Sequence, residues 1–354
     1  MNVDCIILGQ GLCGTLMSYE LYKRKKSFVV IDDGNRLASS KVAAGLINPV
    51  TGKRFVKSWK YDELIHSAIE VYEELEIVLE RKLLRKLDMI QLHTGADEQN
   101  NFQKRLETET HLSTIDDSVF LKTYFNFDYG AGKIAPCFVV DSSELLAGWR
   151  NELIADNCLL EETFDWNNCI AGSKGIRYKH FSASTIICCE GAASFHNPYF
   201  QLLPFSLNKG QALIVDIPEL PKDKIFKHHF KFIPLHDNLF WVGSSFEWKY
   251  ENTQPTVSFT ATVPNYLRKI LCLPFTVIEA AASERPSSVD YRPFVGFHPH
   301  QPAIGLLNGM GSKGFLQAPF FARQLASHLF NGTEILSDVD VKRFSKILSR
   351  FGKA

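Results

Sequence analysis

The start of the chain constrains its fold most strongly. An apolar run of strand length at residues 3–8 leads into the glycine turn Gly9-x-Gly11-x-x-Gly14, and a segment with apolar side chains at helical spacing follows. A second apolar run at residues 28–31 closes the unit. Strand, glycine turn, helix and strand within about 30 residues form the βαβ unit that is typical of dinucleotide-binding proteins.

Each glycine of this turn has its own expected structural role. Gly9 permits the sharp exit from the strand, Gly11 lets the backbone approach a pyrophosphate, and Gly14 allows the helix to pack closely on the sheet. The free N–H groups at the helix start then face the anion. Asp32, at the end of the second strand, is placed to accept a hydrogen bond from a ribose hydroxyl. We therefore predict a dinucleotide site here; a plain strand-to-helix turn is the alternative.

A second glycine-rich turn lies near the other end of the chain. Gly311, Ser312, Lys313 and Gly314 combine unhindered backbone, a hydroxyl and a cation just before a helix expected over residues 319–330. A helix start stabilises negative charge, such as the charge that a reduced flavin develops at its N1–C2 edge, whereas a nicotinamide has no anionic product. The turn therefore favours a flavin, and a solvated turn is the alternative.

The segment after the second strand offers further candidates. Ser39, Ser40, Lys41, Ala44 and Gly45 supply hydroxyls, an ammonium group and small residues where an extended dinucleotide would continue along the surface. The same composition is also found in ordinary loops.

Charge and composition narrow the class of partner. Lys+Arg and Asp+Glu both number 39, so the formal net charge is zero, which argues against nucleic acid or an anionic membrane as partner. No run approaches the ~18 apolar residues of a membrane span, and no secretory leader is recognisable, so we predict a cytoplasmic protein. The eight cysteines form no CxxC pair, and we predict no metal site. A small neutral or zwitterionic ligand fits this balance best.

Taken together, these motifs resemble the FAD-dependent oxidoreductases of the D-amino acid oxidase, glycine oxidase and sarcosine oxidase family. The resemblance spans nearly the whole chain, and its blocks occur in the same order. They are Gly9-x-Gly11-x-x-Gly14, Asp32, Ser39 to Gly45, Ile187 to Ala192 with Gly191, Lys209-Gly210-Gln211, Gly243, Glu284-Arg285-Pro286 with Asp290, and Gly309-x-Gly311-x-x-Gly314.

The resemblance implies non-covalently bound FAD along these blocks, with Gly191 beside the cofactor. It places Arg285 where amino-acid-oxidising relatives hold the substrate carboxylate, a role that suits a planar fork of donors. A structural ion pair of Arg285 with Asp290 or Glu284 is the alternative. The sequence Ala-Ala-Ala-Ser-Glu before Arg285 departs from the aromatic-led, glycine-containing motif of many relatives.

The implied activity is oxidation of the C–N bond of an amino acid or secondary amine by hydride transfer to flavin N5, which gives an imine. Oxygen or another carrier would then reoxidise the flavin. A flavin module acting on aminomethyl groups of tRNA and a non-catalytic redox sensor are the alternatives. The loop residues Lys53, Arg54, Lys57 and Trp59 either reach into the substrate site or form a solvated loop.

The expected fold class is α/β. A Rossmann-type FAD-binding domain, with a mostly parallel sheet and helices, takes residues 1–60, 141–207 and 285–354. An inserted substrate domain built on an antiparallel sheet takes residues 61–140 and 208–284. Within these domains we predict a long amphipathic helix over residues 61–87 and a second helix over residues 142–157, in addition to the one over residues 319–330.

Overall fold

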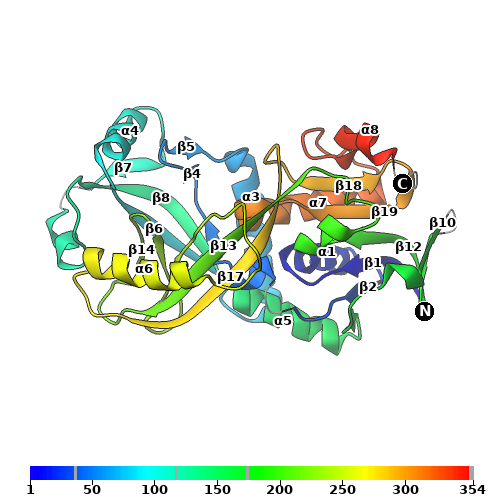
Figure 1. The fold of residues 1–354 in the computed structure, drawn as a ribbon. Coiled ribbons are helices and arrows are strands. Elements are labelled where there is room, and N and C mark those ends of the chain that lie inside the picture. The colour runs from blue at the N-terminus through cyan, green and yellow to red at the C-terminus, as the bar shows by residue number, and fades with distance from the viewer. Residues whose placement is uncertain (36–37, 116–117, 173–174, 351–354) are drawn as a thin grey trace.

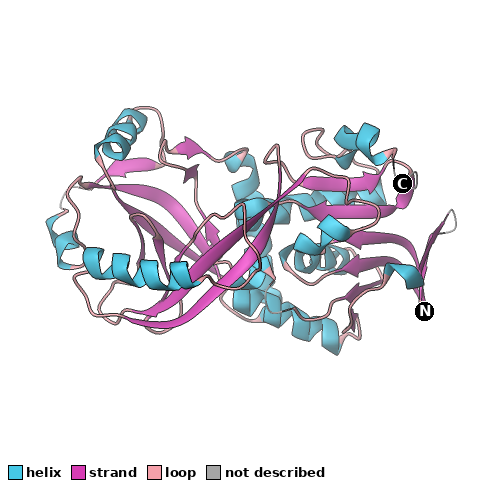
Figure 2. Cartoon of the chain, in the orientation of Figure 1, coloured by secondary structure: helices cyan, strands magenta, loops and turns pink. Residues whose placement is uncertain are grey.

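The computed structural model describes residues 1–35, 38–115, 118–172 and 175–350; the other positions, including 351–354 of the predicted FAD-binding domain, lie outside the described residues. Two β-sheets, here called sheet A and sheet B, lie side by side (Figure 1). Sheet A packs against helices on the side of the molecule that holds the N-terminus, and sheet B forms the other side (Figure 2). The predicted combination of a Rossmann-type sheet with a second, largely antiparallel sheet is confirmed.

Sheet A has a parallel centre because the βαβ unit at the start of the chain feeds its strands in one direction. β1 pairs in parallel with β2 and β12, and β12 pairs in parallel with β19. The strands of sheet A are β1 (Asn2–Leu8), β2 (Phe28–Ile31), β9 (Leu159–Leu160), β10 (Cys169–Gly172), β11 (Gly175–Tyr178), β12 (Phe181–Cys188), β18 (Phe294–His298) and β19 (Gln301–Asn308).

Sheet B is antiparallel except where β14 runs parallel to β6. Its longest pairing joins β13 to β17, so these two strands form a continuous ribbon that reaches toward sheet A (Figure 1). The strands of sheet B are β3 (Leu46–Ile47), β6 (Leu84–Leu92), β7 (Leu112–Thr114), β8 (Ala131–Val140), β13 (Phe205–Asp216), β14 (Lys224–Lys227), β15 (Lys231–Pro234), β16 (Leu239–Gly243) and β17 (Thr276–Ser288). A separate hairpin joins β4 (Val50–Thr51) to β5 (Val56–Lys57).

Most of the helices lie beside sheet A or near the centre of the molecule, and α6 (Val257–Ile270) lies against sheet B (Figure 2). No helix among the described residues is both long and apolar enough to cross a membrane. The α-helices are α1 (Leu12–Lys23), α2 (Ser39–Val42), α3 (Tyr61–Leu79), α4 (Ala96–Leu106), α5 (Ser142–Ala155), α6 (Val257–Ile270), α7 (Gly314–Asn331) and α8 (Ser345–Leu348).

The prediction of one helix from Tyr61 to Leu87 is wrong. α3 ends at Leu79, where Glu80 adopts a left-handed conformation with φ of 52°. The chain then turns, and the N–H groups of Leu83 and Leu84 donate to Glu76 Oε1 at 2.8 and 2.7 Å. Residues 84–92 form β6 because pairing with β8 in sheet B outweighs their helical spacing.

Helix α7 begins at Gly314, five residues before the predicted start at Pro319. A proline inside a helix removes an N–H donor, so the carbonyl of Phe315 loses its usual partner. The Tyr72 hydroxyl of α3 donates to this carbonyl at 2.9 Å and replaces the missing bond. The predicted end of the helix at Gly332 is confirmed, since Gly332 is left-handed with φ of 69°.

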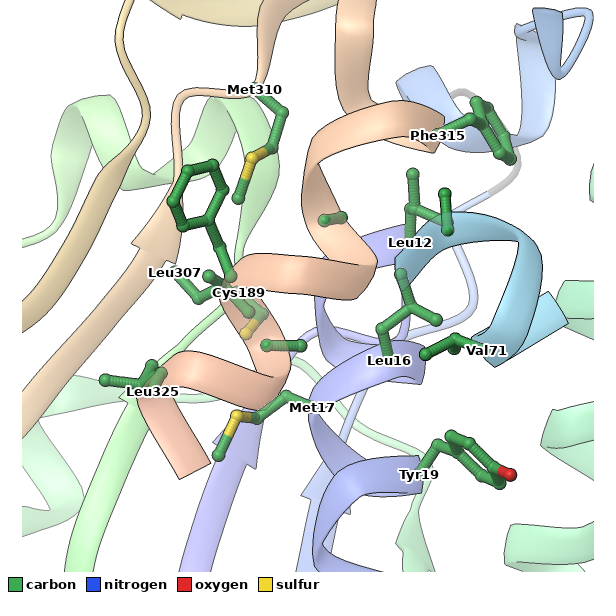
Figure 3. Packing of buried hydrophobic residues seen from close by; sticks show 14 of the residues in the cluster. Leu12, Leu16, Met17, Tyr19, Val71, Cys189, Leu307, Met310, Phe315 and Leu325 are labelled. Carbon is green, nitrogen blue, oxygen red and sulfur yellow. The ribbon is translucent and has the colours of Figure 1, made fainter. Parts of the chain in front are cut away.

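The start of α7 packs against the start of α1, which brings the two glycine turns together. In Figure 3 the side chains of Leu12, Leu16 and Val71 lie close to one another between α1 and α3, and Phe315 lies above them. A Cβ atom on Gly314 would lie 3.2 Å from Leu12 Cδ2, so the two helix starts are in close contact. The predicted turns therefore open onto the same space.

The predicted domain boundaries between residues 207 and 208 and between 284 and 285 fall inside β13 and β17. These strands pair from Phe205 opposite Ser288 to Asp216 opposite Thr276. Both boundaries therefore lie within one continuous ladder.

Candidate active site

A cavity of about 1110 Å³ lies between sheet A and sheet B. Its lining combines backbone turns from sheet A with side chains from the inner face of sheet B. Every predicted site residue except Gly14 lines it: Gly9, Gly11, Asp32, Ser39, Ser40, Lys41, Ala44, Gly45, Gly191, Arg285, Gly311, Ser312, Lys313 and Gly314. Residues that are far apart in the sequence thus share one site.

Gly14 lies behind the cavity and sets the distance between α1 and the preceding turn. A Cβ atom on Gly14 would lie 1.8 Å from the carbonyl oxygen of Gly9. Gly9 has φ of 90°, which favours glycine, and a Cβ there would lie 2.6 Å from the Cys189 carbonyl oxygen. Gly11 precedes α1 without a side-chain cap, so the first N–H groups of the helix have no side-chain acceptor.

The Asp32 carboxylate holds together the end of sheet A. It accepts hydrogen bonds from the Gln10 N–H at 2.7 Å and the Gly34 N–H at 2.8 Å. The Arg150 guanidinium of α5 donates to it at 2.9 Å. A carboxylate has about four lone-pair sites, so one remains for a ligand hydroxyl. Sequence reasoning missed Arg150 because it lies on a helix far along the chain and belongs to no motif.

The segment after β2 is braced against the turn of sheet A. Lys41 Nζ donates to the carbonyl oxygens of Gly34 at 3.2 Å and Asn35 at 2.9 Å. A Cβ on Gly11 would lie 3.0 Å from Ser40 Oγ, so α2 touches the glycine turn. A Cβ on Gly45 would lie 1.8 Å from the Val140 carbonyl oxygen, and this glycine therefore allows the chain to cross β8 closely.

The second glycine turn is fixed by two asparagines. Lys313 Nζ donates to Asn48 Oδ1 at 2.9 Å, and burial lowers the pKa of Lys313 to about 8. Asn308 Nδ2 donates to the carbonyl oxygen of Gly191 at 2.8 Å, which ties this turn to the end of β12. Gly311 has φ of 55°. The two asparagines were not predicted as site residues.

Arg285 lies on β17 and does not form the ion pair that was the alternative to carboxylate binding. Glu284 instead accepts a hydrogen bond from the Tyr250 hydroxyl at 2.7 Å, and Asp290 pairs with Arg343 at 3.2 Å. Within the part of the chain that the structure describes, no carboxylate lies within 4.0 Å of the Arg285 guanidinium.

The Arg285 guanidinium is held by neutral groups. Its Nη1 donates to Asn208 Oδ1 at 2.8 Å and to the Ser245 carbonyl at 3.4 Å, and its central carbon lies 4.8 Å from the centre of the Phe246 ring. A Cβ on Gly210 would lie 1.7 Å from Arg285 Nη2. Burial lowers the pKa of Arg285 to about 10. The charge is therefore oriented without being neutralised.

The loop after β4 reaches the cavity through Lys53 but not through the other three candidate residues. Lys57 pairs with Asp62 at 2.6 Å on the surface. Trp59 stacks on Phe321, and the Arg292 guanidinium lies 4.3 Å from the centre of its ring. None of these three residues lines the cavity, which differs from the hypothesis that Arg54, Lys57 or Trp59 reaches into the substrate site.

Two lysines on the inner face of sheet B, Lys227 and Lys231, also line the cavity and were not predicted. Burial first, and then the charges of Lys227, Lys313 and Arg285, lower the pKa of Lys231 to about 7. A signal was present in the sequence. Side chains two positions apart on a strand share a face, so Lys227 lies on the same face as Ile225. Lys231 lies on the same face as Ile233.

The donor set of this cavity suits FAD. The Gly9 to Gly14 turn offers unhindered backbone N–H groups for a pyrophosphate, and Asp32 retains acceptor capacity for a ribose. The Gly311 to Gly314 turn, at the start of α7, faces the same cavity from the opposite end of the chain. A side chain at Gly14 or Gly45 would collide with the carbonyl oxygen of Gly9 or Val140, so glycine at both positions lets the segments around this cradle pack closely.

Comparison with known proteins agrees with FAD as the cofactor of this site. Residues 4–328 match the family model described as FAD dependent oxidoreductase, DAO. Solved structures with a similar fold include glycine oxidase from Geobacillus kaustophilus, with a TM-score of 0.79 and 19% identity over 97% of this chain and 98% of that one. Iminodiacetate oxidase from Chelativorans sp. BNC1 gives 0.78 and 18% over 97% and 98%. L-Proline dehydrogenase from P. horikoshii gives 0.75 and 15% over 99% and 98%. The chain belongs to the family of FAD-dependent oxidoreductases.

Proposed function

We propose that this protein oxidises the C–N bond of an amino acid or a related amino carboxylate. The observation that carries the proposal is Arg285, an oriented guanidinium at the cavity wall that no described carboxylate neutralises. A buried charge without a partner is costly, and a bound carboxylate would remove that cost. Glycine oxidase, iminodiacetate oxidase and L-proline dehydrogenase, three proteins of similar fold, are named for amino carboxylates, which supports the choice of substrate class.

In this proposal the residues of sheet B position the substrate. The free edge of the Arg285 guanidinium donates two parallel hydrogen bonds to the carboxylate, while Asn208 and Phe246 keep the guanidinium from turning. The α-carbon is thereby fixed relative to the Gly311 to Gly314 turn. When bound, FAD supplies the hydride acceptor, so the amine is left as an imine that water hydrolyses. No side-chain base is required when the amine arrives deprotonated.

We infer that the FAD is held non-covalently. Two thiols, those of Cys13 and Cys189, line the cavity. Burial raises the pKa of Cys13 to about 12 and the pKa of Cys189 well above its ordinary value. A buried thiol in its protonated form is a poor nucleophile, so neither is suited to form a bond to the flavin.

We also propose that the two sheets bind different molecules. Sheet A, with α1, α2 and the start of α7, holds the cofactor, and sheet B supplies the substrate site. The acceptor that reoxidises the flavin is oxygen or another electron carrier.

Measurement of the reaction products tests the proposal directly. The purified, FAD-loaded protein is incubated with single amino acids, once in air and once with an artificial electron acceptor, and the release of ammonia or a primary amine and of the matching oxo acid is measured. Glycine, sarcosine and the other acidic and neutral D- and L-amino acids form the panel, and oxidation of proline is followed instead by the amino oxo acid that hydrolysis of its cyclic imine gives. We expect oxo acid and amine in equal amounts from at least one member. A yellow protein that none of these compounds turns over would favour the redox-sensor alternative.

A further inference from the structure

Lys227 and Lys231 face each other across two neighbouring strands of sheet B. They are directly paired in the register of β14 and β15. Side chains two positions apart on a strand share a face, so Lys227 lies on the face of Ile225, and Lys231 lies on the face of Ile233. Both isoleucines belong to the apolar cluster behind the cavity. Two lysines thus occupy positions where this face otherwise carries apolar side chains, and like charges in direct opposition destabilise a sheet.

Within the described chain, neither of these two ammonium groups forms an ion pair with a carboxylate. Among the residues that the structure describes, no hydrogen bond or ion pair from either Nζ is found, and Lys227 lies only over the Phe55 ring, 5.8 Å from its centre. The pKa of Lys227 is lowered by burial first, while the charge of Glu98 raises it. Glu98 accepts the Thr94 N–H at 2.8 Å and the Thr94 hydroxyl at 2.9 Å, both at Oε2, and among the described residues it forms no ion pair with Lys227.

The positive charge extends beyond this pair. Lys313 and Arg285 both act on Lys231, as the lowered pKa of Lys231 records. One substrate carboxylate would occupy Arg285 and leave the lysine pair unmatched. The dinucleotide phosphates are expected at the Gly9 to Gly14 turn of sheet A, so they do not account for cations on sheet B. A second anion beside Arg285 would match the charge of the lysine pair.

We propose that the substrate carries a second anionic group, a carboxylate or a phosphate, which binds between Lys227 and Lys231. This inference rests on the proposed function, because Arg285 takes the first carboxylate. The substrate class is then an acidic amino carboxylate, with its two anionic groups held by different strands of sheet B. The lysine pair selects the substrate and takes no part in the transfer of electrons.

The test uses three ligands of similar length that cannot be oxidised at a C–N bond. Propionate has one carboxylate, succinate has two, and 3-phosphonopropionate has a carboxylate and a phosphonate. Their binding to the FAD-loaded protein is measured by calorimetry. We expect at least one dianionic ligand to bind on the order of 10- to 100-fold more tightly than propionate. The tighter of the two identifies the second group as carboxylate-like or phosphate-like.

Lys227→Gln and Lys231→Gln separate the lysine pair from general charge effects. Each should reduce the preference for the dianion about tenfold and leave propionate binding within about twofold. Lys224→Gln is the matched control, because Lys224 lies on the same strand but pairs with Asp223 outside the cavity. FAD content and thermal unfolding show whether each variant is folded. If one lysine variant does not fold, the other still tests the inference.

The inference is overturned if propionate binds as tightly as both dianions, or if the lysine variants weaken all three ligands equally. The proposed function is tested separately, by whether amino acids reduce the bound flavin. A lysine-dependent preference for dianions in a protein that no amino acid reduces would keep the second anion site and reject amino-acid oxidation. Oxidation of neutral amino acids without any preference for dianions would do the reverse.

Discussion

Charged side chains at the sheet A end of the cavity are held by hydrogen bonds or ion pairs, whereas three cations described at the sheet B end have no carboxylate partner. Asp32 is satisfied by Arg150 at 2.9 Å and by two backbone N–H groups. Arg285, Lys227 and Lys231 have no carboxylate partner within the described chain. The charges of sheet A therefore maintain the shape of a turn, while those of sheet B remain available to a ligand. The first end is suited to hold a constant cofactor and the second to discriminate among substrates.

Gly14→Ala should have the largest effect on the sheet A end. The new Cβ would lie 1.8 Å from the Gly9 carbonyl oxygen, so the turn between β1 and α1 must move. We expect the affinity for FAD to fall on the order of 10²-fold and the free energy of unfolding to fall by about 1–3 kcal/mol. Titration of the apoprotein with FAD and thermal unfolding measure both. Gly172→Ala is the control, because a Cβ there meets no atom within 4 Å, and equal behaviour of the two variants would contradict the role of Gly14.

Gly210→Ala should affect the sheet B end alone. Its Cβ would lie 1.7 Å from Arg285 Nη2, which is the flexible end of a side chain and can move without the backbone. We expect kcat/KM for a carboxylated substrate to fall by about 10- to 100-fold, because the carboxylate is then misplaced. FAD content should stay as in the wild type. Steady-state kinetics that show no change would mean that the position of Arg285 does not govern catalysis.

Asp32→Ala should weaken FAD binding about tenfold, since three hydrogen bonds that shape the turn are lost together. Turnover of the FAD-saturated variant should be close to that of the wild type. Asp223→Ala removes an exposed carboxylate that pairs with Lys224 and serves as the control. A loss of turnover at saturating FAD would show that Asp32 also shapes the substrate end.

The affinity for a dianionic ligand at the sheet B end should depend on pH. The pKa of Lys231 is lowered to about 7 and that of Lys313 to about 8, mainly by burial. A lysine is charged below its pKa, so the affinity for succinate should decrease as the pH rises from about 7 through 8. Lys231→Gln should remove the lower part of this decrease. Calorimetric titrations across this range that show constant affinity would contradict an uncompensated charge at Lys231.

Sequence reasoning identified residues that line the cavity where they are contiguous in the chain. The turns at Gly9 to Gly14 and at Gly311 to Gly314 each combine a backbone requirement with a helix start, so local spacing was sufficient to predict them. Arg285 was found through its Pro286 neighbour and the order of the family blocks. The FAD-dependent family and the α/β fold class followed from these same blocks.

The remaining site residues depend on pairing that local spacing does not reveal. Arg150 reaches Asp32 because α5 packs near the end of β2, and Lys227 meets Lys231 only through the register of β14 and β15. The predicted helix past Leu79 failed for a related reason, because pairing of β6 with β8 decides the conformation of residues that have helical spacing. For Arg150 and for β6, a contact distant in the sequence determines the outcome.

Anaerobic reduction of the bound flavin by amino acids, compared between the wild type and Arg285→Ala, tests the central claim most directly. The proposal predicts that an amino carboxylate bleaches the wild-type flavin, and that the variant, with its FAD still bound, reacts slower on the order of 10²-fold or more. Bleaching at the same rate in both proteins, or an Arg285→Ala protein that has lost its flavin, would contradict the assignment of Arg285 as the anchor of the substrate carboxylate.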